Sequence, residues 1–143
     1  VKLAYKVNDV VTTYNGIDKI APLAPKERGL INFAYATNFD KWMFDVTANY
    51  IGESRVPAYR EDAFIKTLTA EQFSDPFYLF NAQVTKKFRN FDVYLGGENL
   101  LSYMQENPII DAKNPNSDVF DASLIYAPVM GRVIYAGFRY KIK

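Results

Sequence analysis

The chain has 143 residues, a formal net charge of +1 and neither cysteine nor histidine. These absences exclude disulfides, thiol or histidine catalysis and the usual zinc sites. No apolar run reaches the roughly 18 residues of a transmembrane helix, and no basic run points to a nucleic-acid partner. Membrane-spanning strands are not excluded, because their alternating pattern lowers the mean hydropathy.

Six segments alternate apolar and polar residues and are predicted to be β-strands, at about 1–7, 28–37, 42–52, 78–88, 91–100 and 132–142. In the third segment, Trp42, Phe44 and Val46 share one face. Most of these segments are longer than the roughly five or six residues of a typical strand in a globular protein. They match the ~9–11 residues with which a tilted strand crosses a bilayer. The expected fold class is therefore all-β, an antiparallel transmembrane barrel segment.

Short and long connections alternate between the predicted strands. Residues 38–41 and 89–90 are predicted to form tight turns, whereas 8–27, 53–77 and 101–131 are predicted to be long loops. Loops longer than about 12–15 residues are uncommon in compact domains. Short periplasmic turns and long extracellular loops are typical of outer-membrane barrels. The pattern predicts that the C-terminus lies on the periplasmic side.

Aromatic residues gather near both ends of these strands. Phe39, Trp42, Phe88, Phe91 and Tyr140 are expected at the turn end, with Tyr50, Phe77 and Tyr78 at the loop end. Rings at the two membrane interfaces form the girdles of outer-membrane barrels. The alternative is that the same rings fill the core of a soluble β-sandwich or lipocalin-like barrel. Lys86 lies among the apolar residues, one step before a turn, where it can snorkel to water.

The last predicted strand is similar to the C-terminal signal of bacterial outer-membrane barrels. In that signal a large residue, a glycine and apolar residues lie at fixed offsets from the end of the chain. Tyr135, Gly137, Tyr140 and Ile142 occupy such positions here. The resemblance implies recognition by the barrel-assembly machinery. The terminal residue is Lys143, where most such barrels have an aromatic residue.

Four stretches carry a wider family resemblance: Ala-Pro-Lys-Glu-Arg-Gly-Leu-Ile-Asn at 24–32, Tyr-Leu-Phe-Asn-Ala-Gln-Val-Thr-Lys-Lys-Phe at 78–88, Gly-Gly-Glu-Asn-Leu-Leu at 96–101 and Asn-Pro-Ile-Ile-Asp-Ala at 107–112. In this order and spacing the chain resembles the late barrel of a TonB-dependent outer-membrane receptor, those of Bacteroidota in particular. The resemblance implies a 22-stranded barrel that encloses an N-terminal plug. Such a receptor imports a scarce nutrient, a metal chelate or a cobalamin-like molecule, with energy from the TonB complex. The chain would supply the last six strands and begin within a strand, as a fragment would. The plug and the TonB contact would lie in a missing N-terminal part.

Polar side chains on the predicted inward faces would then form the lumen wall and hold the plug. They are Asp45, Thr47, Asn49, Asn81, Gln83, Thr85, Lys87, Asp92, Glu98 and Arg139. Generic lumen polarity with no specific partner is at least as good an interpretation for each. Asn99 is expected to mark a strand end.

Loop residues are the candidates for recognition of a small-molecule substrate. They are Tyr59, Arg60, Phe64, Phe73, Tyr103 and Tyr126. An equally good interpretation is that they pack the loops onto one another. A charged patch in the second loop consists of Glu53, Arg55, Arg60, Glu61 and Asp62. It is a candidate contact for substrate or a surface partner, although charge on an exposed loop usually serves only solubility. Asp111, Asp118 and Asp121 match no known cation loop, so no metal site and no cofactor are predicted.

No catalytic constellation is present, so an enzyme is not expected. The first hypothesis is transport, with this chain closing a receptor barrel in the outer membrane. Its partners would be the rest of the barrel, the plug and outer-membrane lipid. One alternative is a soluble antiparallel β ligand-binding domain. Another is a small outer-membrane barrel with a structural or adhesive role, which would need at least about eight strands.

Overall fold

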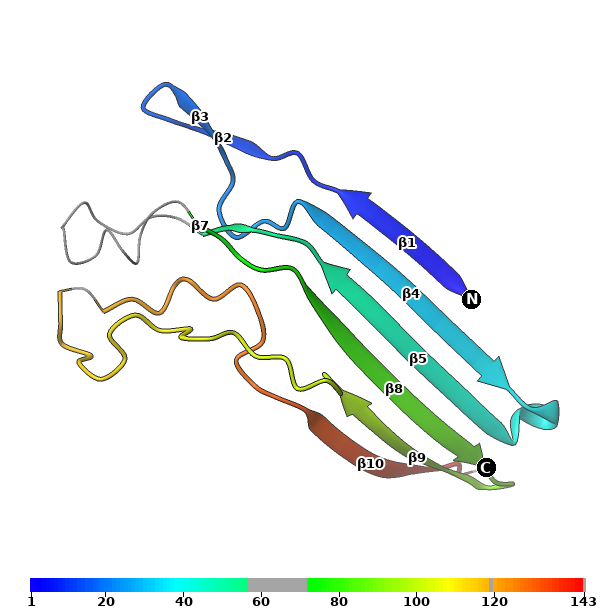
Figure 1. Cartoon of the computed structure of the whole chain (residues 1–143). Helices are drawn as coiled ribbons and strands as arrows, with labels where there is room; N and C mark the ends of the chain where they lie inside the picture. The colour runs from blue at the N-terminus through cyan, green and yellow to red at the C-terminus, as the bar shows by residue number, and fades with distance from the viewer. Residues whose placement is uncertain (57–71, 119, 143) are drawn as a thin grey trace.

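The structure, a computed structural model, describes residues 1–56, 72–118 and 120–142. Its main element is one six-stranded antiparallel sheet. The strands follow one another across the sheet in the order β1 (Lys2–Val7), β4 (Glu27–Ala36), β5 (Trp42–Ile51), β8 (Phe77–Lys87), β9 (Phe91–Glu98) and β10 (Val133–Tyr140) (Figure 1). The expected all-β antiparallel fold is confirmed. Each strand begins and ends within two residues of a predicted segment.

The register of the strand pairs aligns the apolar residues of neighbouring strands across the whole sheet. Phe33 pairs with Val46, Val46 with Ala82, Ala82 with Gly97 and Gly97 with Ile134. Directly opposed residues project to the same side of a sheet. Rows such as this one therefore give the sheet one continuous apolar face. A slip of one residue in any pair would mix the two faces.

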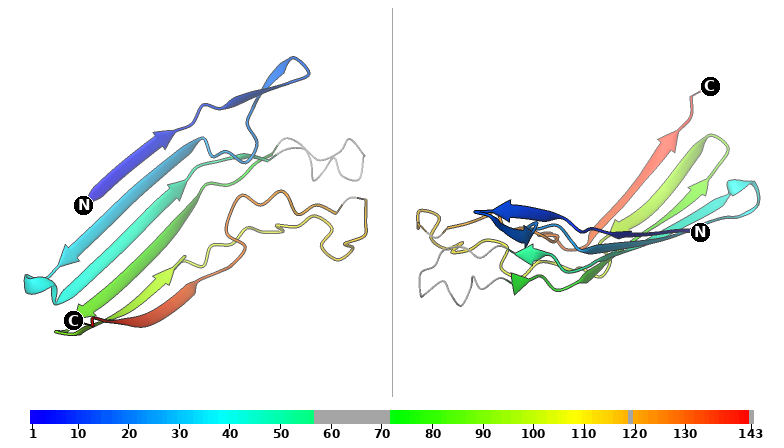
Figure 2. Two further views of the ribbon diagram at one scale, coloured as in Figure 1. Left: turned by 180° about the vertical axis from the view of Figure 1, so that it is seen from behind. Right: turned by 90° about the horizontal axis from the view of Figure 1, so that it is seen from above.

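The sheet is a single curved layer, as the view from above shows (Figure 2). Nothing in the described part of the chain covers its apolar face: Trp42 stays 40% exposed and Phe138 75%. Apart from Pro25 and three glycines, the buried apolar residues among those described are Phe77 and Ala127. The sheet is also open, since β1 and β10 lie at its two edges and do not pair with each other. Within the same residues, no helix is long and apolar enough to cross a membrane.

Turns and long connections lie at opposite ends of the sheet (Figure 1). At one end, the 3₁₀ turn η1 (Asn38–Asp40) joins β4 to β5, and a tight turn joins β8 to β9. At the other end lie the three long connections, and two of them contain short strands that the sequence analysis missed. These are β2 (Val11–Tyr14) with β3 (Ile17–Ile20), and β6 (Arg55–Val56) with β7 (Gln72–Phe73).

The missed β2–β3 hairpin has a clear local cause. Asn15 and Gly16 form its turn with φ angles of 49° and 78°. Asn-Gly is the preferred pair for a two-residue hairpin turn, because both positions need positive φ. The first long connection is therefore a projecting hairpin.

Candidate functional site

The polar face of the sheet gathers all ten residues that were predicted to line a lumen. Asp45 opposes Gln83, Thr47 opposes Asn81, and Asp92 opposes Lys87 and Arg139. Asn49, Thr85 and Glu98 lie in phase with them on β5, β8 and β9. The structure thus brings these side chains together on one surface. Their role as a lumen wall remains a prediction.

Side chains on this face hydrogen-bond mainly to each other. Asn32 Nδ2 donates to Thr47 Oγ1 at 2.9 Å and lies 3.1 Å from Asp45 Oδ1. Tyr135 OH donates to Gln83 Oε1 at 3.1 Å. Asn32 was not among the predicted lumen residues, although its position on β4 places it opposite Thr47. Mutual pairing of this kind holds the side chains in place on a surface that water can still reach.

Two tyrosine–glycine pairs shape the same face near the C-terminus. The Tyr94 ring lies over Gly137, and the Tyr135 ring lies over Gly96, its direct partner across the β9–β10 ladder. A Cβ at either glycine would overlap the ring. Tyr135 and Gly137, predicted as part of an insertion signal, thus pack the polar face. Tyr140 and Ile142, the other two signal residues, are both strongly exposed.

Asp92 is a nearly buried carboxylate at the turn end of the polar face. It is 4% exposed, and its Oδ2 lies 3.4 Å from Lys141 Nζ. Lys87 and Arg139 flank it in register. Its Oδ1 accepts no hydrogen bond from any residue that the structure describes. This oxygen is itself buried, so it is not presented to a donor outside the sheet.

Phe77 was predicted to lie in the aromatic girdle at the loop end, and this prediction is wrong. It belongs to the polar face, where it opposes Ile51, and it is only 4% exposed. Its ring stacks on Tyr103 from the third long connection, with centroids 4.6 Å apart and planes 4° apart. Tyr50 and Tyr78 do lie on the apolar face at this end, 5.2 Å apart. Phe77 therefore anchors a loop, and of the three residues predicted for the loop-end girdle only the two tyrosines lie on the apolar face.

The third connection also folds back over the polar face. Ile125–Pro128 and the strand residues beneath them border an open hollow of about 640 Å³. Apolar residues such as Leu30 and Leu79 form much of its wall, with Lys6 and Arg28 at one side. Burial raises the pKa of Tyr103 and Tyr126, and the charges of Asp75 and Glu106 act in the same direction.

The predicted loop-recognition residues divide into three groups. Tyr103 stacks on Phe77 of β8, and Tyr126 borders the hollow over the sheet, so both lie against the sheet. Phe73 lies in β7 and is about half exposed. Tyr59, Arg60 and Phe64 fall outside the described residues, as do Glu61 and Asp62 of the charged patch.

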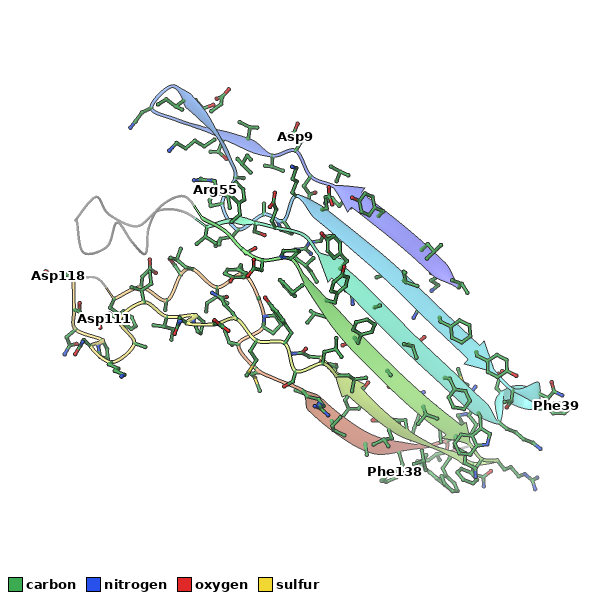
Figure 3. All side chains as sticks on the ribbon, in the orientation of Figure 1. Asp9, Phe39, Arg55, Asp111, Asp118 and Phe138 are labelled. Carbon is green, nitrogen blue, oxygen red and sulfur yellow. The ribbon has the colours of Figure 1, made fainter. Side chains whose placement is uncertain are left out.

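Buried polar side chains tie the loops to the sheet and to one another. Asn99 Nδ2 donates to the carbonyls of Tyr103 and Met130, and Asn99 Oδ1 accepts from Tyr103 N. The expectation that Asn99 marks a strand end is confirmed, since it directly follows β9. Arg55 is buried rather than part of an exposed patch, and its Nε donates to the carbonyl of Ile20 at 2.6 Å. Arg55 thereby joins the first two long connections (Figure 3).

The acidic residues of the third connection serve its turns. Asp111 Oδ1 accepts from Asn114 Nδ2, and Asp121 Oδ1 accepts from the backbone of Ser123. Among the described residues, no group of three or more carboxylates is placed to hold a metal ion.

Comparison of the chain with protein-family models, with curated proteins and with solved structures finds no match.

Proposed function

We propose that this chain is the C-terminal barrel segment of a TonB-dependent receptor that imports a scarce nutrient across the outer membrane. The observation that carries the proposal is the uncovered apolar face of a long-stranded antiparallel sheet. In a soluble β domain that face would need a second layer, and the described part of the chain supplies none. Lipid would cover it without any further protein.

The dimensions of the apolar face fit a bilayer. At about 3.3 Å per residue, the stretch of β5 from Trp42 to Tyr50 is roughly 26 Å long. A strand tilted by about 40° then covers roughly 20 Å of membrane depth, close to the ~25 Å apolar band of outer-membrane barrels. Trp42 and Phe44 lie at the turn end of this stretch, and Tyr50 and Tyr78 at its loop end. These rings fit the two interfacial girdles.

The open edges support membership of a larger barrel. The outer edges of β1 and β10 carry backbone N–H and C=O groups that lipid cannot satisfy. Six strands are also too few to enclose a lumen, because even about eight leave room only for side chains or one small ligand. Further strands of the same protein would pair with both edges and close the barrel.

The polar face would then line the lumen. The hollow beneath Ile125–Pro128 would open toward the extracellular mouth, where substrate enters. The nutrient itself, a metal chelate or a cobalamin-like molecule, is substrate and not a resident cofactor.

Cell fractionation followed by intact mass measurement tests the architecture. We expect the protein carrying this sequence in the outer-membrane fraction, with a mass several times the 16.4 kDa of this chain. Recovery only from the soluble fraction would overturn the membrane proposal. Deleting its gene should slow growth when one scarce nutrient limits, and excess of that nutrient should restore growth. Unchanged growth under every such limitation would count against transport.

A further inference from the structure

Lys86 occupies an aromatic clamp at the turn end of the apolar face. Its ammonium lies 4.7 Å from the centroid of the Trp42 ring and 5.1 Å from that of Phe88. Phe88 stacks on Phe91 at 4.4 Å, which fixes the second ring. Cation–π attraction to both rings holds the ammonium on the apolar side of the sheet. The charge is therefore positioned within the girdle instead of reaching freely into water.

Further cations surround the same place. Lys41 and Arg89, from the two turns, line a hollow of about 650 Å³ together with Trp42, Lys86 and Phe88. Lys87 also borders it, but Lys87 is paired with Asp40 at 3.4 Å. Within the residues that the structure describes, neither Lys41, Lys86 nor Arg89 takes part in an ion pair. The hollow is therefore apolar on one side and strongly cationic at its rim.

We propose that this hollow binds the phosphate head group of an anionic phospholipid in the leaflet on the turn side. Phosphate oxygens are good acceptors for ammonium and guanidinium donors, and such charge-assisted hydrogen bonds are the stronger ones. Lys86 is held in place before binding, which lowers the entropy cost of fixing it. The acyl chains would lie along Phe44, Val84 and Leu95, which form the next row of the apolar face.

The inference goes beyond transport and rests on the proposed function only for the placement of this face in lipid. A soluble phosphate would engage the cations alone and gain nothing from the apolar row. An anionic phospholipid matches both parts of the site. A zwitterionic phospholipid has the same chains, but its positive group opposes the cations.

Lipid binding to the full-length protein tests the site. The protein is purified in mild detergent, and native mass spectrometry measures its affinity for phosphatidylglycerol and for phosphatidylcholine. The variant Lys41→Gln/Lys86→Gln/Arg89→Gln should bind phosphatidylglycerol roughly tenfold more weakly. The control Lys26→Gln/Lys113→Gln/Arg132→Gln removes the same charge at the loop end and should bind as the parent does. Excess inorganic phosphate should not displace the lipid.

A second variant separates the clamp from net charge. Trp42→Leu keeps all the cations but removes the ring beneath Lys86, and it should also weaken phosphatidylglycerol binding. Gel mobility without heating checks that every variant is folded. Equal losses in the two triple variants, or equal affinity for the two lipids, would overturn the inference and leave the receptor proposal intact. Absence of the protein from membranes would instead defeat the receptor proposal.

Discussion

Arginine in place of Val46 tests the assignment of the apolar face to lipid. Val46 lies midway between the girdle residues Trp42 and Tyr50, roughly 13 Å from each along β5. With a tilt of about 40°, this corresponds to roughly 10 Å of depth from either interface. Arginine near the bilayer midplane costs about 2–4 kcal/mol. We expect Val46→Arg to lower the free energy of unfolding in phospholipid bilayers by that amount, measured by urea titration of the full-length protein.

A matched control lies one residue away on the neighbouring strand. Ala34 follows Phe33, the register partner of Val46, so its depth is nearly the same. It projects from the polar face opposite Asp45, beside a hollow of about 170 Å³ that can admit a longer side chain. An arginine there gains an exposed carboxylate partner, and Ala34→Arg should change stability by about 1 kcal/mol or less. Equal losses in the two variants would refute the assignment of the faces.

Three further predictions concern the third long connection. Phe77→Ala removes a buried ring stacked on Tyr103 and should lower the free energy of unfolding by about 3–5 kcal/mol. An unchanged midpoint of urea unfolding would contradict the role of Phe77 as the anchor of this connection. Asn99→Ala removes the hydrogen bonds to Tyr103 and Met130 and should lower the free energy of unfolding by about 2–4 kcal/mol. Because the φ angle of residue 99 is 47°, a conformation that glycine adopts more easily than alanine, Asn99→Gly should lower it by about 1 kcal/mol less. Because folding raises the pKa of Tyr103 and Tyr126, loop stability should hold below the ordinary value of 10.0 and fall as pH rises through the folded values. Protease cleavage of the loop from pH 8 to 11 measures this, and Tyr126→Phe should weaken the dependence.

The six strands of the main sheet could be predicted from the sequence because each repeats a period of two over its whole length, from six residues in β1 to eleven in β8. The faces then restrict the register, since a one-residue slip would place residues such as Val46 and Phe80 on opposite faces, and the short turns fix which of the remaining pairings forms. The polar surface was predictable for the same reason. The error at Phe77 came from assigning an aromatic residue to the girdle by its position near a strand end. Its odd position, in phase with Leu79 and Asn81, already placed it on the polar face.

The loops could not be predicted as well, because long-range contacts determine them. Arg55 is buried through a bond to Ile20, 35 residues away in sequence, and no local pattern signals that contact. The fold-back of Ile125–Pro128 over the sheet is equally non-local. The β2–β3 hairpin is different, since Asn15-Gly16 between two β-rich stretches is a sufficient local signal. The clamp around Lys86 needed the register of Trp42 with Lys86 to be known first.

Spin labelling along β5 tests the central claim most directly. The chain contains no cysteine, so single cysteines carrying a nitroxide can replace Phe44, Asp45, Val46 and Thr47 in turn, in an otherwise cysteine-free full-length protein in bilayers. We expect nitroxides at 44 and 46 to collide mostly with oxygen, which concentrates in lipid, and hardly with a water-soluble nickel chelate. Labels at 45 and 47 should show much lower oxygen access. Loss of this two-residue alternation, or its reversal, would contradict a membrane barrel with this face in lipid.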